Sequence, residues 1–237
     1  MVGVTVLILA IETATTAVAV ALHDGVSVIA ELTVAQGRRH AETLVPAIGF
    51  LCAQVQCSVN DVTAIAVDVG PGLFTGLRVG VTTAKTLAMA LGVPLLGEMS
   101  LSLLARQGGR PGERVAAVID ARRKELYVAV YDLHPSGDVV EVLAPMVAPA
   151  EVVRSVLDQW CPPDTIVVGD PLHQLEAFAG SPWCHLGPLF PSAATLSAAV
   201  VPRLHAGENP QPNDLELVYL RAPDAQITWS NRHGLAT

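Results

Sequence analysis

The residues with the clearest chemical potential lie at a glycine turn between two apolar segments. The mostly β-branched run 65–69 stops at Gly70-Pro71-Gly72, and Thr75 then opens an amphipathic run from Gly76 to Leu91. A strand, a glycine turn and a helix start gather free backbone N–H groups at the positive end of a helix dipole. Glycines also let two backbone segments approach closely. This junction can therefore receive an anion.

Four residues of the junction are candidates for holding an anion or a nucleotide: Gly70, Gly72, Thr75 and Arg78. Their spacing fits neither G-x-x-x-x-G-K-[ST] nor a regular G-x-G-x-x-G, so neither common nucleotide motif is present. Arg78 falls in the first helical turn, where a cation opposes the helix dipole by roughly 0.3–1 kcal/mol. That position indicates an anion or a carboxylate partner, and we favour a plain structural salt bridge.

A second group of polar residues follows the first apolar run, which ends at Ile11. Thr13 and Thr15 carry hydroxyl groups that can bind phosphate, although hydroxyl-rich turns are common without any ligand. Glu12 is either a vestigial catalytic acid or a hydrogen-bonded residue at a strand end. We favour the second interpretation, because no metal motif accompanies the residue.

The histidines give no support to a metal site on a helix. They occupy positions 23, 40, 134, 173, 185, 205 and 233. No pair lies three or four residues apart, so no helix can present two imidazoles to one metal ion. We expect no metal site in this chain.

Hydrophobic periodicity predicts alternating strands and helices. Strands are expected at 6–11, 18–22, 26–34, 65–69, 114–120, 126–133, 139–147 and 165–168. Helices are expected at 41–55, 76–91, 101–107, 149–159, near 171–178 and at 192–206, with 180–191 irregular. Pro46 must lie in the first turn of its helix or mark a kink.

A linker-like stretch, 108–113, divides the chain into two expected lobes. The N-terminal lobe spans residues 1–108 and carries the partner interface. A smaller C-terminal α/β lobe spans 109–237, with a tail that packs back on the first lobe. Both lobes open with a strand, a turn and a strand, as in a structural duplication.

The composition, net charge and distribution of basic residues indicate what kind of protein this is. Of the 237 residues, 51% are hydrophobic and 15% are charged, which indicates apolar surface in a partner interface. The net charge of −8 opposes independent binding to nucleic acid. No basic residue precedes Arg38, so the basic segment of a signal peptide is missing. We expect a cytoplasmic protein without membrane contact, and four reduced, buried cysteines.

Five segments together resemble the bacterial TsaB family. They are ILAIETATTAVAVAL (8–22), RRHAETLVPAI (38–48), GPGLFTGLRVGVTTAKTLA (70–88), VIDARRKELYVAVY (118–131) and VYLR (218–221). They follow the family's order along nearly the whole chain, and only the related catalytic family, TsaD, shares much of the GPGxFTGxRxG block. The resemblance implies an α/β fold with two actin-like lobes of the ASKHA superfamily, ribonuclease-H-like and built on mixed sheets.

The resemblance also implies a function. The chain would be a non-catalytic subunit required for threonylcarbamoyl transfer to N6 of adenosine 37 in transfer RNAs that read codons beginning with A. It would dimerise with catalytic TsaD, cooperate with the ATPase TsaE and meet transfer RNA only through the complex. The chain itself would need no cofactor, with ATP or ADP bound at the interface of the complex. TsaD-like enzymes carry a His-x-x-x-His motif after the helix and strand that follow the glycine turn, and residues 93–104 contain no histidine.

Small residues recur every four positions in the helix 76–91 and create a smooth face. A helical glycine costs roughly 1 kcal/mol relative to alanine, so the two glycines of this face need a reason, and close helix contact is one. The resemblance implies that helices 41–55 and 76–91 meet TsaD, or a second copy when the chain is alone; packing within the monomer is the alternative. The expected interface residues are His40, Leu44, Ile48, Leu51, Gly76, Leu77, Gly80, Thr83, Ala84 and Leu87.

Two other classes of function stay open at this point. One is an ATP-dependent small-molecule kinase or a glycoprotease-like enzyme of the same superfamily. A kinase needs a second phosphate-binding glycine turn, for which Gly169-Asp170-Pro171 is a weak candidate. The other is a homodimeric binding protein that uses the same helices. Gly80→Leu is expected to break assembly if the smooth face forms an interface.

Overall fold

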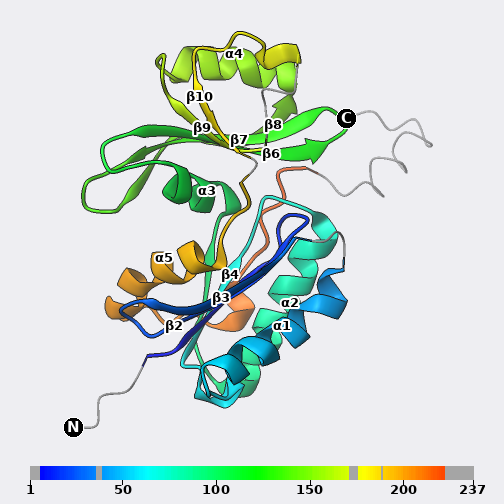
Figure 1. Ribbon diagram of the computed structural model, residues 1–237, viewed down its shortest axis with the longest axis vertical. Helices are drawn as coiled ribbons and strands as arrows, with labels where there is room; N and C mark the ends of the chain where they lie inside the picture. Colours follow the sequence, from blue (N-terminus) through cyan, green and yellow to red (C-terminus); the bar gives the residue numbers. More distant parts are fainter. Residues whose placement is uncertain (1–5, 36–38, 171–175, 188, 222–237) are drawn as a thin grey trace.

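Two α/β lobes, each built on a five-stranded mixed sheet, make up the computed structural model, which describes residues 6–35, 39–170, 176–187 and 189–221 (Figure 1). The first sheet has the order β3-β2-β1-β4-β5 and the second β10-β9-β6-β7-β8. In each sheet three strands form an antiparallel meander, and two later strands add in parallel beside its first strand. The predicted two-lobed α/β fold is confirmed, and the second lobe repeats the strand order of the first.

The strands of the first sheet are β1 (Ile8–Glu12), β2 (Val18–His23), β3 (Val28–Val34), β4 (Ala64–Asp68) and β5 (Leu95–Glu98). Those of the second sheet are β6 (Arg114–Arg122), β7 (Glu125–Leu133), β8 (Val139–Pro149), β9 (Ile166–Gly169) and β10 (Cys184–Leu186). The helices are α1 (His40–Gln54), α2 (Phe74–Leu91), α3 (Ser100–Gly108), α4 (Ala150–Trp160) and α5 (Ala193–His205).

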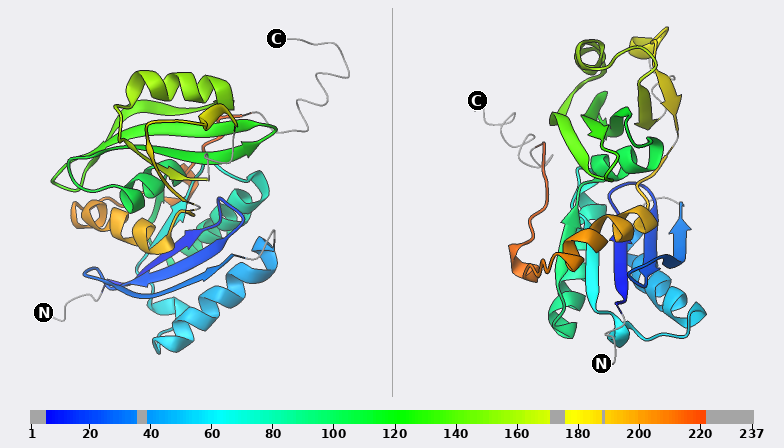
Figure 2. Two further views of the ribbon diagram at one scale, coloured as in Figure 1. Left: turned by 45° about the horizontal axis from the view of Figure 1, so that its top comes forward. Right: turned by 90° about the vertical axis from the view of Figure 1, so that its left-hand side faces the viewer.

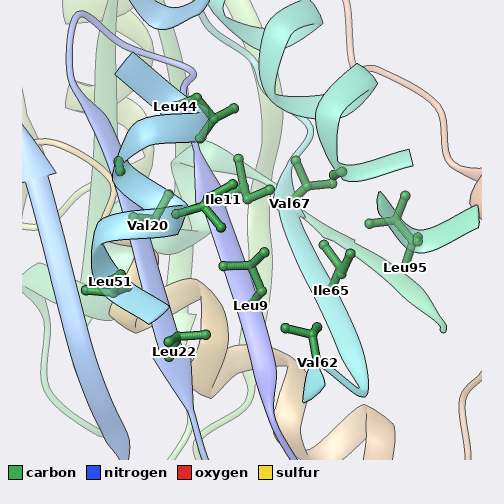
Figure 3. Close-up of a cluster of buried hydrophobic side chains, with 14 of the residues drawn as sticks. Leu9, Ile11, Val20, Leu22, Leu44, Leu51, Val62, Ile65, Val67 and Leu95 are labelled. Carbon is green, nitrogen blue, oxygen red and sulfur yellow. The ribbon is translucent and has the colours of Figure 1, made fainter. Parts of the chain in front are cut away.

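The first sheet is covered on both faces, which explains why β1 is a continuous apolar run. Because side chains alternate along a strand, Leu9 and Ile11 point to one face and pack in a core with Leu44 and Leu51 of α1 (Figure 3). Ile8 and the alanines of the opposite face pack against α5. The small alanine side chains let α5 lie close to that face.

The second sheet is also covered on both faces (Figure 2). Its inner face packs against α3 and its outer face against α4. As a result α3 and α5 lie in contact between the two sheets (Figure 1).

The chain after residue 109 does not stay in the second lobe, because α5 returns to the first sheet. The segment 210–221 then runs along both lobes, and we call it the C-terminal strap. Lys85 Nζ donates to the Leu215 carbonyl (2.7 Å) and the Val218 N–H to the Val69 carbonyl (2.9 Å), both in the first lobe. Arg221 Nη1 donates to Glu125 Oε2 of the second lobe (2.8 Å).

Some local predictions need correction. Of the two placements expected for Pro46, the first turn is excluded, because the residue lies further inside α1. The stretch expected to be irregular contains the three-residue strand β10, which is too short to show a period. The helix expected near 171–178 is a 3-10 helix over Glu176–Phe178, and 171–175 lie outside the described residues. Of the four cysteines expected to be buried, Cys184 is exposed and Cys57 is half-buried.

Candidate nucleotide cleft and partner surface

The predicted glycine turn joins β4 to α2 and is held by bonds within the chain. Gly70 has a φ of +102°, a conformation that favours glycine. Its N–H donates to Asp68 Oδ1 (2.7 Å), and its carbonyl accepts the Ser100 N–H (3.0 Å). The turn is therefore fixed by the ends of β4 and α3.

The turn after β1 lies directly on the smooth face of α2. The hydroxyl of Thr13 donates to the Gly76 carbonyl (2.9 Å). A Cβ at Gly72 would overlap the Ala14 carbonyl, and one at Gly80 would overlap the Thr13 hydroxyl. The small residues of α2 thus admit a segment of the same chain, which is the alternative that the sequence left open. Assembly with a partner does not require this face.

Within the described part of the chain, Arg78 has aromatic partners and not the carboxylate of the salt bridge that we expected. Its guanidinium lies 4.1 Å from the centre of the Phe74 ring, and its Nε donates weakly to the Tyr219 hydroxyl (3.5 Å). The Phe74 and Tyr219 rings are 5.4 Å apart. A guanidinium over a ring face is attracted by the ring quadrupole, so Arg78 joins α2 to the C-terminal strap.

Among the predicted anion-binding residues, only Thr15 lines the small cavity between the lobes. This cavity holds about 110 Å³, and its lining includes Asp120, Arg122 and Asp170. Asp170 Oδ2 accepts the Asp120 N–H (2.5 Å), and burial raises the pKa of Asp170. Usual small-molecule pockets hold roughly 300–1,000 Å³, so in this conformation the cleft is small for a nucleotide.

The other predicted anion-binding residues lie outside this cavity, for different reasons. Thr13 and Gly70 are buried in the bonds described above, and Gly72 packs on Ala14. Thr75 is exposed on α2, and Arg78 is turned to the strap. The structure therefore does not gather the six residues around one ligand.

Glu12 and Asp68 end two adjacent strands, and neither side chain is exposed. Glu12 Oε1 accepts the Ala14 N–H (2.7 Å), and Asp68 Oδ1 accepts the Ser100 hydroxyl (2.7 Å). Burial, followed by the charge of Asp68, raises the pKa of Glu12 well above its usual value, and burial raises the pKa of Asp68 to about 6. Glu12 is thus hydrogen-bonded at the end of β1, as the favoured interpretation requires.

The residues predicted to form the partner interface lie mostly inside the monomer. Eight are buried: His40, Leu44, Ile48, Leu51, Gly76, Leu77, Gly80 and Ala84. Thr83 and Leu87 are half-buried. His40 Nε2 lies 2.8 Å from the Thr15 carbonyl. Side chains that pack on the chain's own first sheet are not available to a partner, so this residue set needs correction.

The opposite faces of the same two helices carry exposed apolar side chains. Val45 of α1 is 62% exposed, Phe50 of α1 is 54% exposed and Met89 of α2 is 56% exposed. We call these residues the outer α1/α2 face. This face could have been found in the sequence. An amphipathic helix on a sheet normally has polar residues at its solvent-facing positions, and here those positions hold apolar residues. The apolar residues that recur with the helical period were predicted to contact the partner, but they pack inside the first lobe.

A larger cavity of about 710 Å³ lies elsewhere, among α3, the β7–β8 turn and α5. Arg106 lines it and donates to the Gly137 carbonyl of that turn (2.9 Å). None of the predicted anion-binding or partner-interface residues lines it.

Comparison with known proteins gives the family. The family model described as "TsaD: tRNA N6-adenosine threonylcarbamoyltransferase" matches residues 27–144. An uncharacterized protein of Mycobacterium leprae is 35% identical over 95% of this chain, and the "tRNA threonylcarbamoyladenosine biosynthesis protein TsaB" of Bacillus subtilis is 36% identical over 52% of it. The aligned regions span 58% and 54% of those two relatives. The structure of YeaZ from Pseudomonas aeruginosa has a TM-score of 0.74 and 30% identity, and the match covers 91% of this chain and all of that one.

This chain belongs to the TsaB/YeaZ family. The family resemblance read from the sequence motifs is confirmed, and the two mixed sheets confirm the α/β class. The match to the TsaD family model includes α1 and α2 of this TsaB/YeaZ member. Among the described residues, no three His, Cys, Asp or Glu side chains converge where they could hold a metal ion. No described helix combines the length and hydropathy that a membrane crossing requires.

Proposed function

We propose that this TsaB/YeaZ member is the non-catalytic partner of a TsaD-type transferase that adds a threonylcarbamoyl group to adenosine 37 of transfer RNA. The observation that carries the proposal is the family membership, because the named relatives are threonylcarbamoyladenosine biosynthesis proteins and the matching family model is the transferase itself. The chain and TsaD would then be related proteins that pair.

The burial of the two carboxyl groups at the ends of β1 and β4 supports a subunit without catalysis of its own. A catalytic acid or base has to come within hydrogen-bond distance of its substrate. Glu12 and Asp68 are fully buried and hydrogen-bonded within the chain, so they do not reach a ligand in the cleft. The chain would act by holding TsaD in a competent conformation, and TsaE would supply the ATPase step.

The outer α1/α2 face is the surface that we assign to TsaD. Its exposed phenylalanine and methionine are residue types that are enriched in protein interfaces, and its exposed valine extends the apolar surface. Because the chain has a net charge of −8, transfer RNA would be bound mainly by the partner. Since the cavity between the lobes holds only about 110 Å³, we place ATP or ADP at the junction with TsaD.

The test mixes this chain with TsaD of the same organism and measures the mass of the product by light scattering on a sizing column. A heteromer is expected for the wild-type chain and for Val152→Glu, and its loss is expected for Val45→Glu. Val152 is a matched control, because it is 46% exposed on α4 of the other lobe. Circular dichroism shows whether both variants keep the fold.

Two results would overturn the proposal. The first is the absence of a heteromer with the wild-type chain, with and without ATP and TsaE. The second is normal threonylcarbamoyladenosine, measured by mass spectrometry of digested transfer RNA, in cells that lack the chain. If Val45→Glu still binds TsaD, the role survives but the assignment of the outer α1/α2 face is wrong. The mass of the chain alone shows whether it forms a homodimer.

A further inference from the structure

The end of α1 brings together two cysteines that the sequence spacing does not pair. Helix α1 ends at Gln54, and Gln56 adopts a φ of +57°. The Gln56 N–H donates to the Ala53 carbonyl (3.3 Å), and the Cys57 N–H donates to the Cys52 carbonyl (3.0 Å). These two bonds, around one left-handed residue, define a Schellman motif.

A Schellman motif places two particular side chains in contact. They belong to the residue after the left-handed one and to the residue five positions before it, which are normally both apolar. Here those residues are Cys57 and Cys52. Burial, followed by the interaction with the Cys57 thiol, raises the pKa of Cys52 to about 11. The turn thus forms a dithiol where other helices place a hydrophobic contact.

The two thiols differ in access. Cys52 is buried in the core of the first lobe, and Cys57 is half-buried at its edge. The charge of Asp61, in the following 3-10 helix, also acts on Cys52. A reagent from solvent therefore meets Cys57 first, with Cys52 in position behind it.

We propose that Cys52 and Cys57 form a reversible dithiol–disulfide site, with Cys57 as the attacking thiol and Cys52 as the resolving thiol. With oxidised glutathione as oxidant, the Cys57 thiolate attacks one sulfur of the glutathione disulfide and releases one glutathione thiolate. The Cys52 thiol then loses its proton and attacks Cys57 Sγ, which releases the second glutathione. The protein gains one disulfide and loses two hydrogen atoms, and the glutathione disulfide is reduced to two thiols.

The geometry favours this step in the folded chain. A disulfide needs α-carbons within roughly 4.4–6.8 Å, and the bond from the Cys57 N–H to the Cys52 carbonyl holds the two residues close. The unfolded chain lacks this arrangement. Oxidation to the disulfide is therefore more favourable in the folded chain than in the unfolded chain. By linkage, the disulfide raises the free energy of unfolding by the same amount. In a reducing compartment such a disulfide is transient and suits redox sensing more than a structural role.

The test incubates the reduced full-length chain with buffers of reduced and oxidised glutathione, with and without urea. Because Lys and Arg are absent between His40 and Leu77, trypsin leaves both cysteines in the single peptide 40–78. Mass spectrometry is expected to show this peptide two hydrogen atoms lighter. The equilibrium constant for its oxidation is expected to be roughly tenfold or more higher in the folded chain than in urea.

Three variants separate the roles of the thiols. Cys52→Ser is expected to trap a glutathione adduct on Cys57, because the resolving thiol is gone. Cys57→Ser is expected to leave the peptide 40–78 unmodified at the same reagent concentration. Cys184→Ser removes an exposed thiol outside the pair and should oxidise at 40–78 like the wild type. The proposal is overturned if the folded chain oxidises no more readily than the unfolded chain, or if glutathione accumulates on Cys184 while the peptide 40–78 stays reduced.

Discussion

Glu12 and Asp68 end adjacent strands in the interior of the first lobe, and one carboxyl oxygen of each, Glu12 Oε2 and Asp68 Oδ2, has no hydrogen-bond donor among the described residues. The Ala14 N–H binds one carboxyl group, and the Ser100 hydroxyl and Gly70 N–H bind the other. Two buried carboxylates in contact repel each other, so the pair retains a proton at a pH where exposed carboxyl groups have lost theirs. We therefore expect the folded chain to keep one proton on this pair.

This pair makes stability depend on pH. Folding raises both pKa values from 4.5 for Glu12 and 3.8 for Asp68, so the folded chain binds more protons than the unfolded chain. The contribution to stability is complete below the unfolded pKa values, and it is lost as the pH rises through the folded ones. For Asp68 that window runs from about pH 4 to about pH 6, and for Glu12 it begins near pH 4.5 and extends upward from there.

Glu12→Gln tests this account. The glutamine amide can accept the Ala14 N–H and donate to the Asp68 carboxylate without holding a titrating proton. We expect the free energy of unfolding in urea to change little at pH 5 and to increase at pH 8 by roughly 1–3 kcal/mol. Glu42→Gln, at an exposed position of α1, should show no such difference. Equal destabilisation of Glu12→Gln at both pH values would contradict the shared proton.

The two helical glycines Gly80 and Gly49 should respond in opposite ways to alanine. A Cβ at Gly80 would overlap the Thr13 hydroxyl, whereas one at Gly49 meets nothing within 4 Å. We expect Gly80→Ala to lower the free energy of unfolding by roughly 1–3 kcal/mol through overpacking. Gly49→Ala should raise it by roughly 0.5–1 kcal/mol through helix propensity. Urea denaturation measures both, and a neutral Gly80→Ala would mean that the smooth face of α2 is open.

The helices and strands could be predicted from the sequence because their hydrophobic periodicity is strong. The surfaces were misassigned because periodicity shows which face of a helix is apolar but does not show what that face packs against. The buried stripe of α1 and the small stripe of α2 are real, but Leu44 and Gly80 meet the chain's own sheet and turn. The same limit applies to Arg78, whose partner Tyr219 lies 141 residues away in the sequence. Contacts of this range follow from the path of the chain, and no local pattern encodes them. The Cys52–Cys57 contact is local, but it depends on the left-handed conformation of Gln56. Glutamine rarely adopts this conformation, so the contact could not be predicted from the residue type.

The C-terminal strap should open locally when its anchor in the first lobe is cut. Leu215 packs against the first core and lies over Gly97. We expect Leu215→Ala to speed amide hydrogen exchange in the segment 210–221, with little change in β1 and β4. Leu186→Ala, at a residue 46% exposed on β10, is the control and should leave the strap unchanged. Faster exchange spread evenly over the first sheet would mean that the strap is part of the core rather than a separate unit.

The two anchors of the strap should also be coupled energetically. Arg221 pairs with Glu125 Oε2 at 2.8 Å and donates to the Ala121 carbonyl at 2.9 Å, so it ties the strap to the second lobe while Leu215 ties it to the first. Ordering the residues between Leu215 and Arg221 costs conformational entropy. When one of these two anchors is removed, the other must offset that cost alone. The effects of Leu215→Ala and Arg221→Ala on the free energy of unfolding should therefore differ from additivity by about 0.5 kcal/mol or more, beyond the usual error for distant sites. A double-mutant cycle in urea measures this coupling, and strict additivity would show that the two lobes hold the strap independently.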